Sequence, residues 1–351
     1  MVVPNRAIST VMDVSLALLI ISATVLLIGT YVHTETESID GESGDHALQS
    51  LSGSTVTITY DISEANEAGE RATDSEHYEP PDDLDPDDVG ALYEITTYGS
   101  AMDLLADGAQ TNLVIDDTEV FAYGHSVEQS VDGAVQDRLV GSDGQIFTVA
   151  TWEPYDGAAI TGTATAGNEP PHTEDVSSAS AEVSANPGSL DAEHLATRFE
   201  VGETASPGDS IEDGFDAIGR EIAEAIIEGY FPPTQTQYTL ESSLTETAVT
   251  LYNYRQLADV VGVDIDDSIT GPDANAAQAN QVLLKGETAD ETGLEDFIAD
   301  DLRDSPAGEK IKEAYDDLGE SPSDDETEAF EAVLDETIAT DTVDVTVQTW
   351  D

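Results

Sequence analysis

The chain of 351 residues contains no cysteine. This absence excludes disulfide bonds, thiolate metal sites, a cysteine nucleophile and a lipid anchor attached to cysteine. If the protein is held at a membrane, a segment of the polypeptide itself must therefore hold it there.

Lysine and arginine are scarce: ten stand against 75 aspartate and glutamate residues, giving a formal net charge of -65. No basic patch is available to meet phosphates, so we exclude nucleic acid as a partner. Such a charge strains a compact state by self-repulsion, whereas molar salt shortens the Debye length to about 3 Å and screens it. We interpret the composition as halophilic. An acidic disordered chain is the competing interpretation, but 39% hydrophobic residues and well-phased amphipathic segments favour a folded core.

Long uncharged apolar runs are also missing, with the exception of Val14 to Val32. As a helix rising about 1.5 Å per residue, this run is roughly 28 Å long, which matches the hydrocarbon core of a bilayer. Arg6 is the one basic residue near the run, and acidic residues follow from Glu35 onward. The positive-inside tendency then places the N-terminus in the cytoplasm and the body outside the cell. The sequence predicts a single-pass protein of the cell membrane in contact with the lipid bilayer, with a buried core helix as the alternative.

The chain divides into four parts by composition. We expect a short cytoplasmic leader at 1–13, a transmembrane helix at 14–32, a polar stalk at 33–50 and an acidic ectodomain at 51–351. No small-x-small cleavage site follows the apolar run, so the helix is expected to stay in the mature protein. Within the ectodomain, two acidic segments rich in proline or serine are predicted to be disordered-like loops, near 63–90 and 167–188.

Hydrophobic periodicity predicts an α+β ectodomain. Alternation predicts strands at 54–60, 112–115, 119–123, 145–152, 159–166 and 343–348. Helical spacing predicts helices at 91–106, 126–139, 211–230, 245–261, 274–284, 294–302, 306–318 and 324–338, while 190–201 stays open between helix and strand. The strands at 145–166 form a hairpin, and we expect the C-terminal strand to pair with it in an antiparallel sheet whose one face is covered by helices.

The common catalytic and metal-binding patterns do not occur in this sequence. Its six histidines are isolated from one another and lack the i,i+4 pairing of a zinc motif. Neither a G-x-S-x-G nucleophile elbow nor a phosphate-binding loop is found. Carboxylates are so abundant that any pair suited to acid–base catalysis is uninformative. We therefore predict no catalytic residue, no cofactor and no metal ion, and a protein that is not an enzyme.

One acidic cluster has carboxylates at positions 1, 3, 5 and 12 of a calcium loop: Asp83, Asp85, Asp87 and Glu94. Asp88 replaces the glycine that the sharp turn at position 6 requires, and Pro86 restricts the backbone between the ligands. We favour a solvated acidic loop here and keep calcium binding as the alternative.

The residues before the apolar run carry a processing pattern, in which Arg6 and Ala7 are followed by Ile8 and then by Asp13. This pattern resembles the class III signal peptide of archaeal type IV pilin-like proteins, and together with the acidic ectodomain it resembles the uncharacterised pilin-like proteins of haloarchaea. The resemblance is carried by the N-terminal segment through the apolar run. The resemblance implies that a prepilin-type peptidase cuts between Ala7 and Ile8 on the cytoplasmic face. Asp13 would then be sixth in the mature chain, where bacterial pilins carry an acid at the fifth position. The ectodomain is also large for a major pilin, which favours a minor or accessory subunit.

The same resemblance makes the apolar helix an assembly element that contacts other pilin-like subunits. Small side chains that allow helices to approach closely recur along it: Ser15, Ala17, Ser22, Ala23 and Gly29. Asp13 is either an ordinary residue at the lipid headgroups or the partner of a new amine on a neighbouring subunit. We therefore predict a membrane-anchored, non-catalytic component of a haloarchaeal type IV pilus or secretion-type assembly at the cell surface. The alternative is a signal-anchored extracellular binding or hydrolytic domain that joins no filament.

Overall fold

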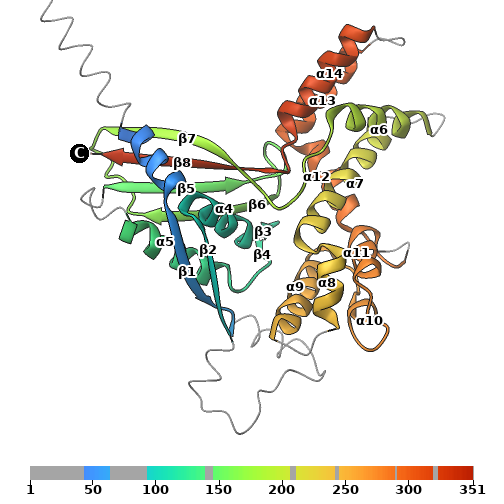
Figure 1. The fold of residues 1–351 in the computed structure, drawn as a ribbon. Helices are drawn as coiled ribbons and strands as arrows, with labels where there is room; N and C mark the ends of the chain where they lie inside the picture. The colour runs from blue at the N-terminus through green and yellow to red at the C-terminus, as the bar shows by residue number, and fades with distance from the viewer. Residues whose placement is uncertain are drawn as a thin grey trace, which may run out of the picture.

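The computed structural model describes residues 43–63, 93–138, 145–205, 211–241, 245–288, 291–318 and 323–350. These residues form a sheet lobe and a helical lobe, which lie side by side (Figure 1). The predicted α+β class is confirmed, because an antiparallel sheet and many helices are present. The predicted membrane helix at 14–32 lies outside the described residues, and none of the helices within them is long and apolar enough to cross a bilayer.

The sheet lobe is built on six antiparallel strands in the order β4-β3-β6-β5-β8-β7. The strands are β3 (Leu113–Ile115), β4 (Thr118–Glu119), β5 (Ile146–Trp152), β6 (Ile160–Gly167), β7 (Val176–Ser184) and β8 (Thr342–Trp350). The predicted hairpin is β5 and β6, and the C-terminal strand β8 pairs with β5 as expected. β8 therefore returns from the helical lobe into the interior of the sheet (Figure 1).

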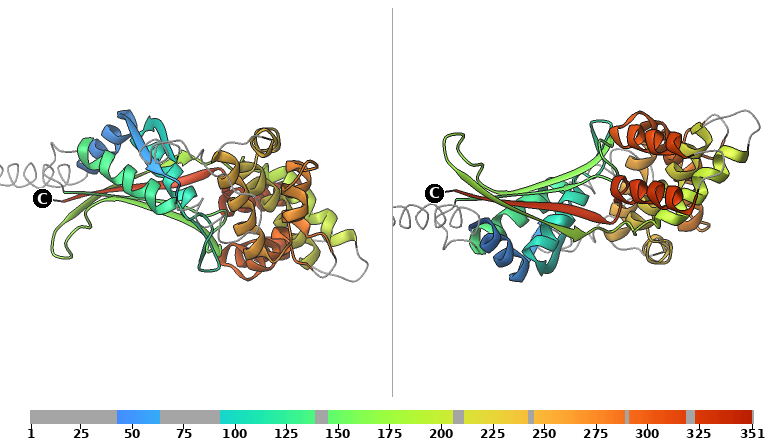
Figure 2. Two further views of the ribbon diagram at one scale, coloured as in Figure 1. Left: turned by 90° about the horizontal axis from the view of Figure 1, so that it is seen from below. Right: turned by 90° about the horizontal axis from the view of Figure 1, so that it is seen from above.

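Helices of the described chain cover one face of this sheet (Figure 2). The covering layer contains the helical segment 43–53, the hairpin of β1 (Thr55–Asp61) and β2 (Glu94–Ser100), α4 (Ala101–Thr111) and α5 (Gly124–Arg138). α4 crosses β6 so closely that a Cβ atom added to Gly162 would lie 2.2 Å from the carbonyl oxygen of Ala109. Alternate residues of β5, such as Ala150 and Trp152, are fully buried beneath this layer. On the opposite face, β6 and β7 carry mainly threonine and serine.

The helical lobe is organised around α7 (Ile211–Tyr230). Its other helices are α6 (Ala192–Ala205), α8 (Pro233–Leu240), α9 (Thr245–Val261), α10 (Asp266–Ile269), α11 (Ala276–Lys285), α12 (Leu294–Asp304), α13 (Pro306–Asp317) and α14 (Asp324–Thr337). Phe215, Ile218 and Ile222 form the buried stripe of α7, as their helical spacing predicts. α14 begins with a capping box, in which Ser323 and Glu326 satisfy each other's backbone N–H groups.

Hydrogen bonds between buried or half-buried groups join the two lobes. The hydroxyl of Tyr155 donates to Asp301 on α12 at 2.7 Å, and the hydroxyl of Tyr230 on α7 donates to the carbonyl oxygen of Gln110 at 2.9 Å. The indole N–H of Trp152 donates to the carbonyl oxygen of Thr340 at 2.9 Å. A single hydrophobic core continues through both lobes, so each lobe positions the other.

The predicted helix at 91–106 is wrong over its first half. Residues 94–100 form β2, which pairs with β1, and the helix α4 begins only at Ala101. The apolar spacing that indicated one helix in fact runs through a strand and the helix after it. Ile95, Thr96 and Thr97 are β-branched and favour the strand, while the Ser100 hydroxyl accepts from the backbone N–H of Asp103 and starts the helix.

The predicted loop near 167–188 and the predicted stalk at 33–50 also need correction. Residues 176–184 form β7, a strand of serine, alanine and valine that is held by its pairing with β8. Residues 43–50, the end of the predicted stalk, are helical. In both places small or polar residues give a weak local signal, and contacts with the rest of the fold decide the structure.

Candidate assembly surface

One edge of the sheet is closed by side chains of α5. β3 pairs only with the first three residues of β6, so the rest of β6 has no strand beside it there. The Glu128 carboxylate accepts from both the backbone N–H and the hydroxyl of Thr165, each at 2.8 Å. Asp132 accepts from the N–H of Gly167 at 2.7 Å, and the Asn112 amide donates to the carbonyl oxygen of Thr163 at 3.0 Å. Backbone groups satisfied in this way cannot recruit another strand.

The opposite edge, β7, is left open. Its register with β8 runs without a bulge from Val176 to Ser184, and it contains neither proline nor lysine, the residues that commonly protect an edge. The backbone N–H of Ala185 donates to the carbonyl oxygen of Asp341 at 2.7 Å. Because bonded pairs alternate along an antiparallel ladder, the odd-numbered residues of β7 bond to β8 and the even-numbered residues direct their N–H and C=O groups outward. No described strand pairs with these outward groups.

A groove of roughly 840 Å³ lies beside the C-terminal half of this open edge. Its walls are residues 181–184 of β7, the start of α4 and one side of the helical segment 43–53. Apolar surface in the groove comes from Leu48, Met102 and Val183. The same walls carry His46 and three acidic side chains: Asp45, Asp103 and Glu182. The groove is thus wide, open and mixed in polarity, and it lies next to unpaired backbone.

The helical segment 43–53 rests directly on β7 at one end of this groove. The backbone N–H of Gly44 donates to the hydroxyl of Ser177 at 3.2 Å. A Cβ atom added to Gly44 would lie 3.0 Å from the carbonyl carbon of Ser178 and 3.1 Å from the nitrogen of Ala179. Glycine therefore allows the helix to touch the strand backbone. The first residues that the structure describes therefore lie against β7.

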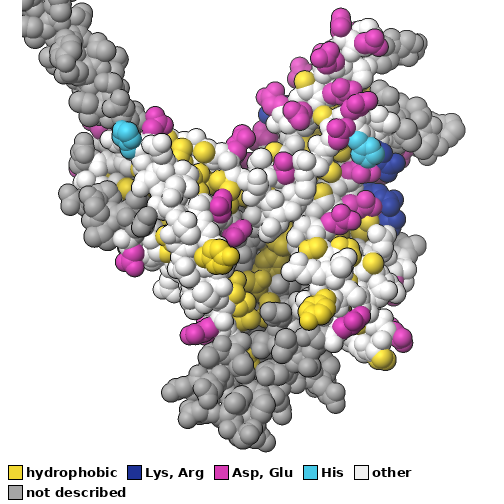
Figure 3. Space-filling view, viewed as in Figure 1, with side chains coloured by type: hydrophobic (Ala, Val, Ile, Leu, Met, Phe, Trp, Pro, Cys, Tyr) yellow, Lys and Arg dark blue, Asp and Glu magenta, His cyan; other side chains and the backbone are white. Residues whose placement is uncertain are grey.

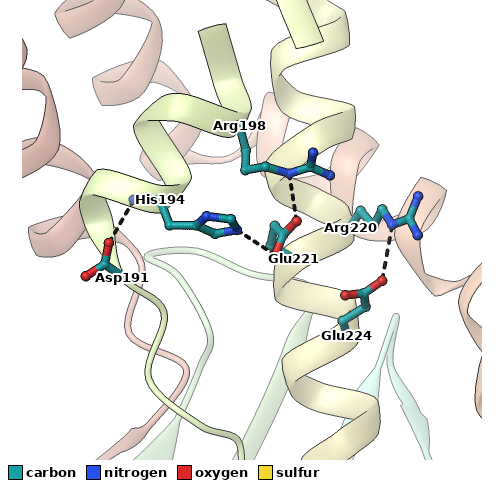
Figure 4. A network of polar contacts seen from close by, with 6 residues as sticks. All are labelled: Asp191, His194, Arg198, Arg220, Glu221 and Glu224. Carbon is teal, nitrogen blue, oxygen red and sulfur yellow. Dashed lines mark hydrogen bonds and ion pairs between the residues drawn. The ribbon is translucent and has the colours of Figure 1, made fainter. Parts of the chain in front are cut away.

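A second cluster, on the helical lobe, is an ion-pair network between α6 and α7 (Figure 4). Glu221 lies between the side chains of Arg198 and His194, with Arg198 Nε at 2.8 Å and His194 Nε2 at 3.3 Å. Arg220 pairs with Glu224 at 3.2 Å on the same face. The Asp191 side chain accepts from the backbone N–H of His194 at 2.8 Å and so holds the first turn of α6. The contacts of Glu221 fasten α6 to α7, and the other two stabilise each helix on its own.

Carboxylates whose pKa is raised lie on different elements of the described chain: Asp107 on α4, Glu153 after β5, Asp216 on α7 and Glu295 on α12. Burial raises the pKa of each, and at Glu295 the charges of Arg220 and Lys285 oppose the rise. Burial and the neighbouring Tyr123 raise the pKa of Tyr60 to about 12. No group of three His, Asp or Glu side chains that could hold a metal ion occurs among the described residues.

The residues predicted for processing and assembly all lie outside the described ranges: Arg6, Ala7, Ile8, Asp13, Ser15, Ala17, Ser22, Ala23 and Gly29. Of the calcium-loop candidates, Glu94 opens β2 opposite Asp61 and is exposed, whereas Asp83, Asp85 and Asp87 are not described. These predictions stay predictions. The open β7 edge was missed, although valine and alanine alternate with serine over much of 176–184.

Residues 12–350 match DUF7284, a family of unknown function. The chain belongs to DUF7284. No curated protein and no solved structure matches it. The DUF7284 match takes in both the apolar run at 14–32 and the whole described body, whereas Arg6, Ala7 and Ile8 precede it. One family match thus spans both the apolar run and the described body.

Proposed function

We propose that this protein is a membrane-anchored, non-catalytic, pilin-like component of a haloarchaeal type IV pilus or secretion-type surface assembly. The observation that carries the proposal is the contact between the helical segment 43–53 and β7. This segment includes the end of the predicted stalk, and it is seated on the β7 edge, which pairs with no further strand among the described residues, beside a groove. A subunit held by its N-terminal helix therefore presents backbone and groove to its neighbours close to that helix.

The family match and the composition support the same proposal. The match joins the apolar run to the body, as an anchored subunit requires. The -65 charge suits an exposed protein in brine. Small residues along the apolar run suit side-by-side packing of membrane helices, in which close backbone approach replaces the hydrophobic effect.

A signal-anchored binding domain is the second candidate. The groove of roughly 840 Å³ favours it, because the volume falls within the range of about 300–1,000 Å³ that is common for ligand pockets. The groove is open, however, and its polar groups are spread over its walls, which suits a macromolecular neighbour better than an enclosed small molecule.

Purification of a C-terminally tagged protein from native membranes tests the proposed function. We expect the intact mass to be that of a chain beginning at Ile8. We also expect pilus or secretion components to be recovered with the native apolar run but not when 14–32 is replaced by an unrelated hydrophobic helix. Arg6→Ala should abolish the Ile8 start, because the leader pattern loses its one basic residue. Asn5→Ala, which leaves Arg6 and Ala7 intact, is the matched control.

An uncleaved Met1 start combined with no helix-dependent partner would favour the signal-anchored alternative. The same partners with either helix would locate recognition in the ectodomain. Hydrolytic activity in the purified body would overturn the non-catalytic assignment.

A further inference from the structure

We propose that β7 is a self-association edge, which pairs antiparallel with β7 of a second copy about a two-fold axis at Ser180. The two six-stranded sheets would then join into one. This inference goes beyond the proposed function, because it requires neither cleavage of the leader nor incorporation into a filament.

The backbone of β7 is self-complementary about Ser180. Its even-numbered residues direct their N–H and C=O groups away from β8, as argued above from the bond of Ala185 to Asp341. An axis at Ser180 pairs even residues with even residues: Ser178 faces Glu182 of the second copy, and Val176 faces Ser184 of the second copy. Every outward donor and acceptor of one strand therefore meets its counterpart on the other, without a bulge or a slip in register.

The side chains of β7 also allow a second copy to approach. Eight of its nine residues are serine, alanine or valine. Glu182 is the one charged residue of this strand, although the whole chain has a net charge of -65. In the proposed register the two glutamates face serines and lie roughly 14 Å apart along the strands, so no like charges stand directly opposite each other. Ser180 already shares a hydrogen bond of 2.8 Å with the hydroxyl of Thr346 on β8, and this hydroxyl row would continue across the axis.

The groove gives a reason for a second copy to occupy this edge. Gly44 lies against Ser178, and Ser178 of the second copy would stand opposite Glu182, a wall residue of the groove. The first described residues of segment 43–53 in the second copy would therefore enter the groove of the first copy. By symmetry, the same residues of the first copy would enter the groove of the second. The two Gly44 positions would lie roughly 11 Å apart, given about 3.4 Å per residue and 4.8 Å between strands. Packed helices are commonly 8–10 Å apart, so the segments fit side by side.

A two-fold axis perpendicular to the sheet keeps both segments on the same face of the joined sheet. The first described residues of the two copies then lie close together on one side of the pair, as the proposed anchoring of both chains in one membrane requires. The other edge of the sheet cannot make this pair, because Glu128 and Asp132 occupy its backbone donors.

Cysteine cross-linking of the full-length protein in native membranes at molar salt tests the pairing, because the chain has no cysteine of its own. Cα atoms of a hydrogen-bonded antiparallel pair lie about 5.5 Å apart, within the range of about 4.4–6.8 Å found in disulfides. We expect Ser180→Cys to give a covalent dimer on mild oxidation. Ser180 is exposed and its hydroxyl bonds to the hydroxyl of the half-buried Thr346, so the change should be tolerated.

Ser184→Cys on the same strand is the matched control. Its two copies would lie roughly 27 Å apart, too far for a disulfide, so it should stay monomeric. The double change Val176→Cys with Ser184→Cys should restore the dimer, since these two positions face each other.

Equal cross-linking of Ser180→Cys and Ser184→Cys would reveal random collision and overturn the proposal. It would also be overturned by a lack of dimer in both Ser180→Cys and the double variant, or by capture of a different protein at Ser180. If the Ser180→Cys dimer forms but no pilus partners are recovered, the result counts against the proposed function alone. If pilus partners are recovered but no dimer forms, the result counts against the β7 pair alone.

Discussion

At the scale of single residues, Asp301 holds the two lobes together. One of its carboxylate oxygens accepts from the Tyr155 hydroxyl at 2.7 Å and from the backbone N–H of Ala159 at 2.8 Å. Burial and the negative charge of Asp301 raise the pKa of Tyr155 above its usual value, so the hydroxyl stays protonated and remains a donor. Nothing in the sequence around position 301 distinguishes this aspartate from the many others, because its role depends on a turn far away in the chain.

Asp301→Ala should lower the free energy of unfolding by about 1–3 kcal/mol, because the buried Tyr155 hydroxyl loses its acceptor. Urea denaturation in molar KCl measures the change. Asp300→Ala is the matched control. The Asp300 side chain is largely exposed and pairs with Arg303 at the surface, so this change should alter the free energy of unfolding by no more than about 0.5 kcal/mol. Equal losses in the two variants would refute the role given to Asp301.

At the scale of elements, the sequence predicts best where one element buries a continuous stripe of its own. α7 and α9 begin and end where periodicity places them, since their apolar residues repeat over several turns. The Ser-rich strand β7 and the strand β2 were missed, because neighbouring strands rather than their own side chains stabilise them. The candidate assembly surface depends on β7, so it could not be predicted before the register was known.

Glycine also decides how closely elements pack, as at Gly219, where α7 meets α12. A Cβ atom added there would lie 2.8 Å from both the Cα and the nitrogen of Ala299. Gly219→Ala should therefore force the helices apart and cost about 1–3 kcal/mol in the free energy of unfolding.

Gly133 in α5 is the matched control for Gly219, because nothing lies within 4 Å of a Cβ atom added to it. Gly133→Ala should stabilise the protein by about 0.5–1 kcal/mol, since alanine loses less conformational entropy in a helix. Thermal unfolding in molar salt compares the two variants. A stabilising Gly219→Ala would show that α7 and α12 can separate without cost.

At the scale of the whole molecule, charge is distributed unevenly. Seven of the eight described lysines and arginines lie in the helical lobe, between Arg198 and Lys312, and the sheet lobe holds only Arg138. Acidic side chains gather over α13 and α14 of the same lobe (Figure 3). At Asp216 on α7, burial raises the pKa first and the charge of Asp213 raises it further, against the influence of Arg303. Neighbouring carboxylates thus act on one another even in the lobe with the most cations.

This charge distribution predicts that the folded state depends on salt. The chain from Glu35 onward should be compact in molar KCl or NaCl and should expand as salt is removed, because a Debye length of about 3 Å in molar salt lengthens to about 30 Å at 0.01 M and exposes each carboxylate to many others. The hydrodynamic radius and the circular dichroism spectrum report the change. Sucrose without salt is the control, since it favours burial by exclusion from the protein surface but does not screen charge. If charge screening is the cause, sucrose should restore the compact hydrodynamic radius less completely than KCl does. A circular dichroism spectrum that is the same in molar salt and in its absence would contradict the halophilic interpretation of the -65 charge.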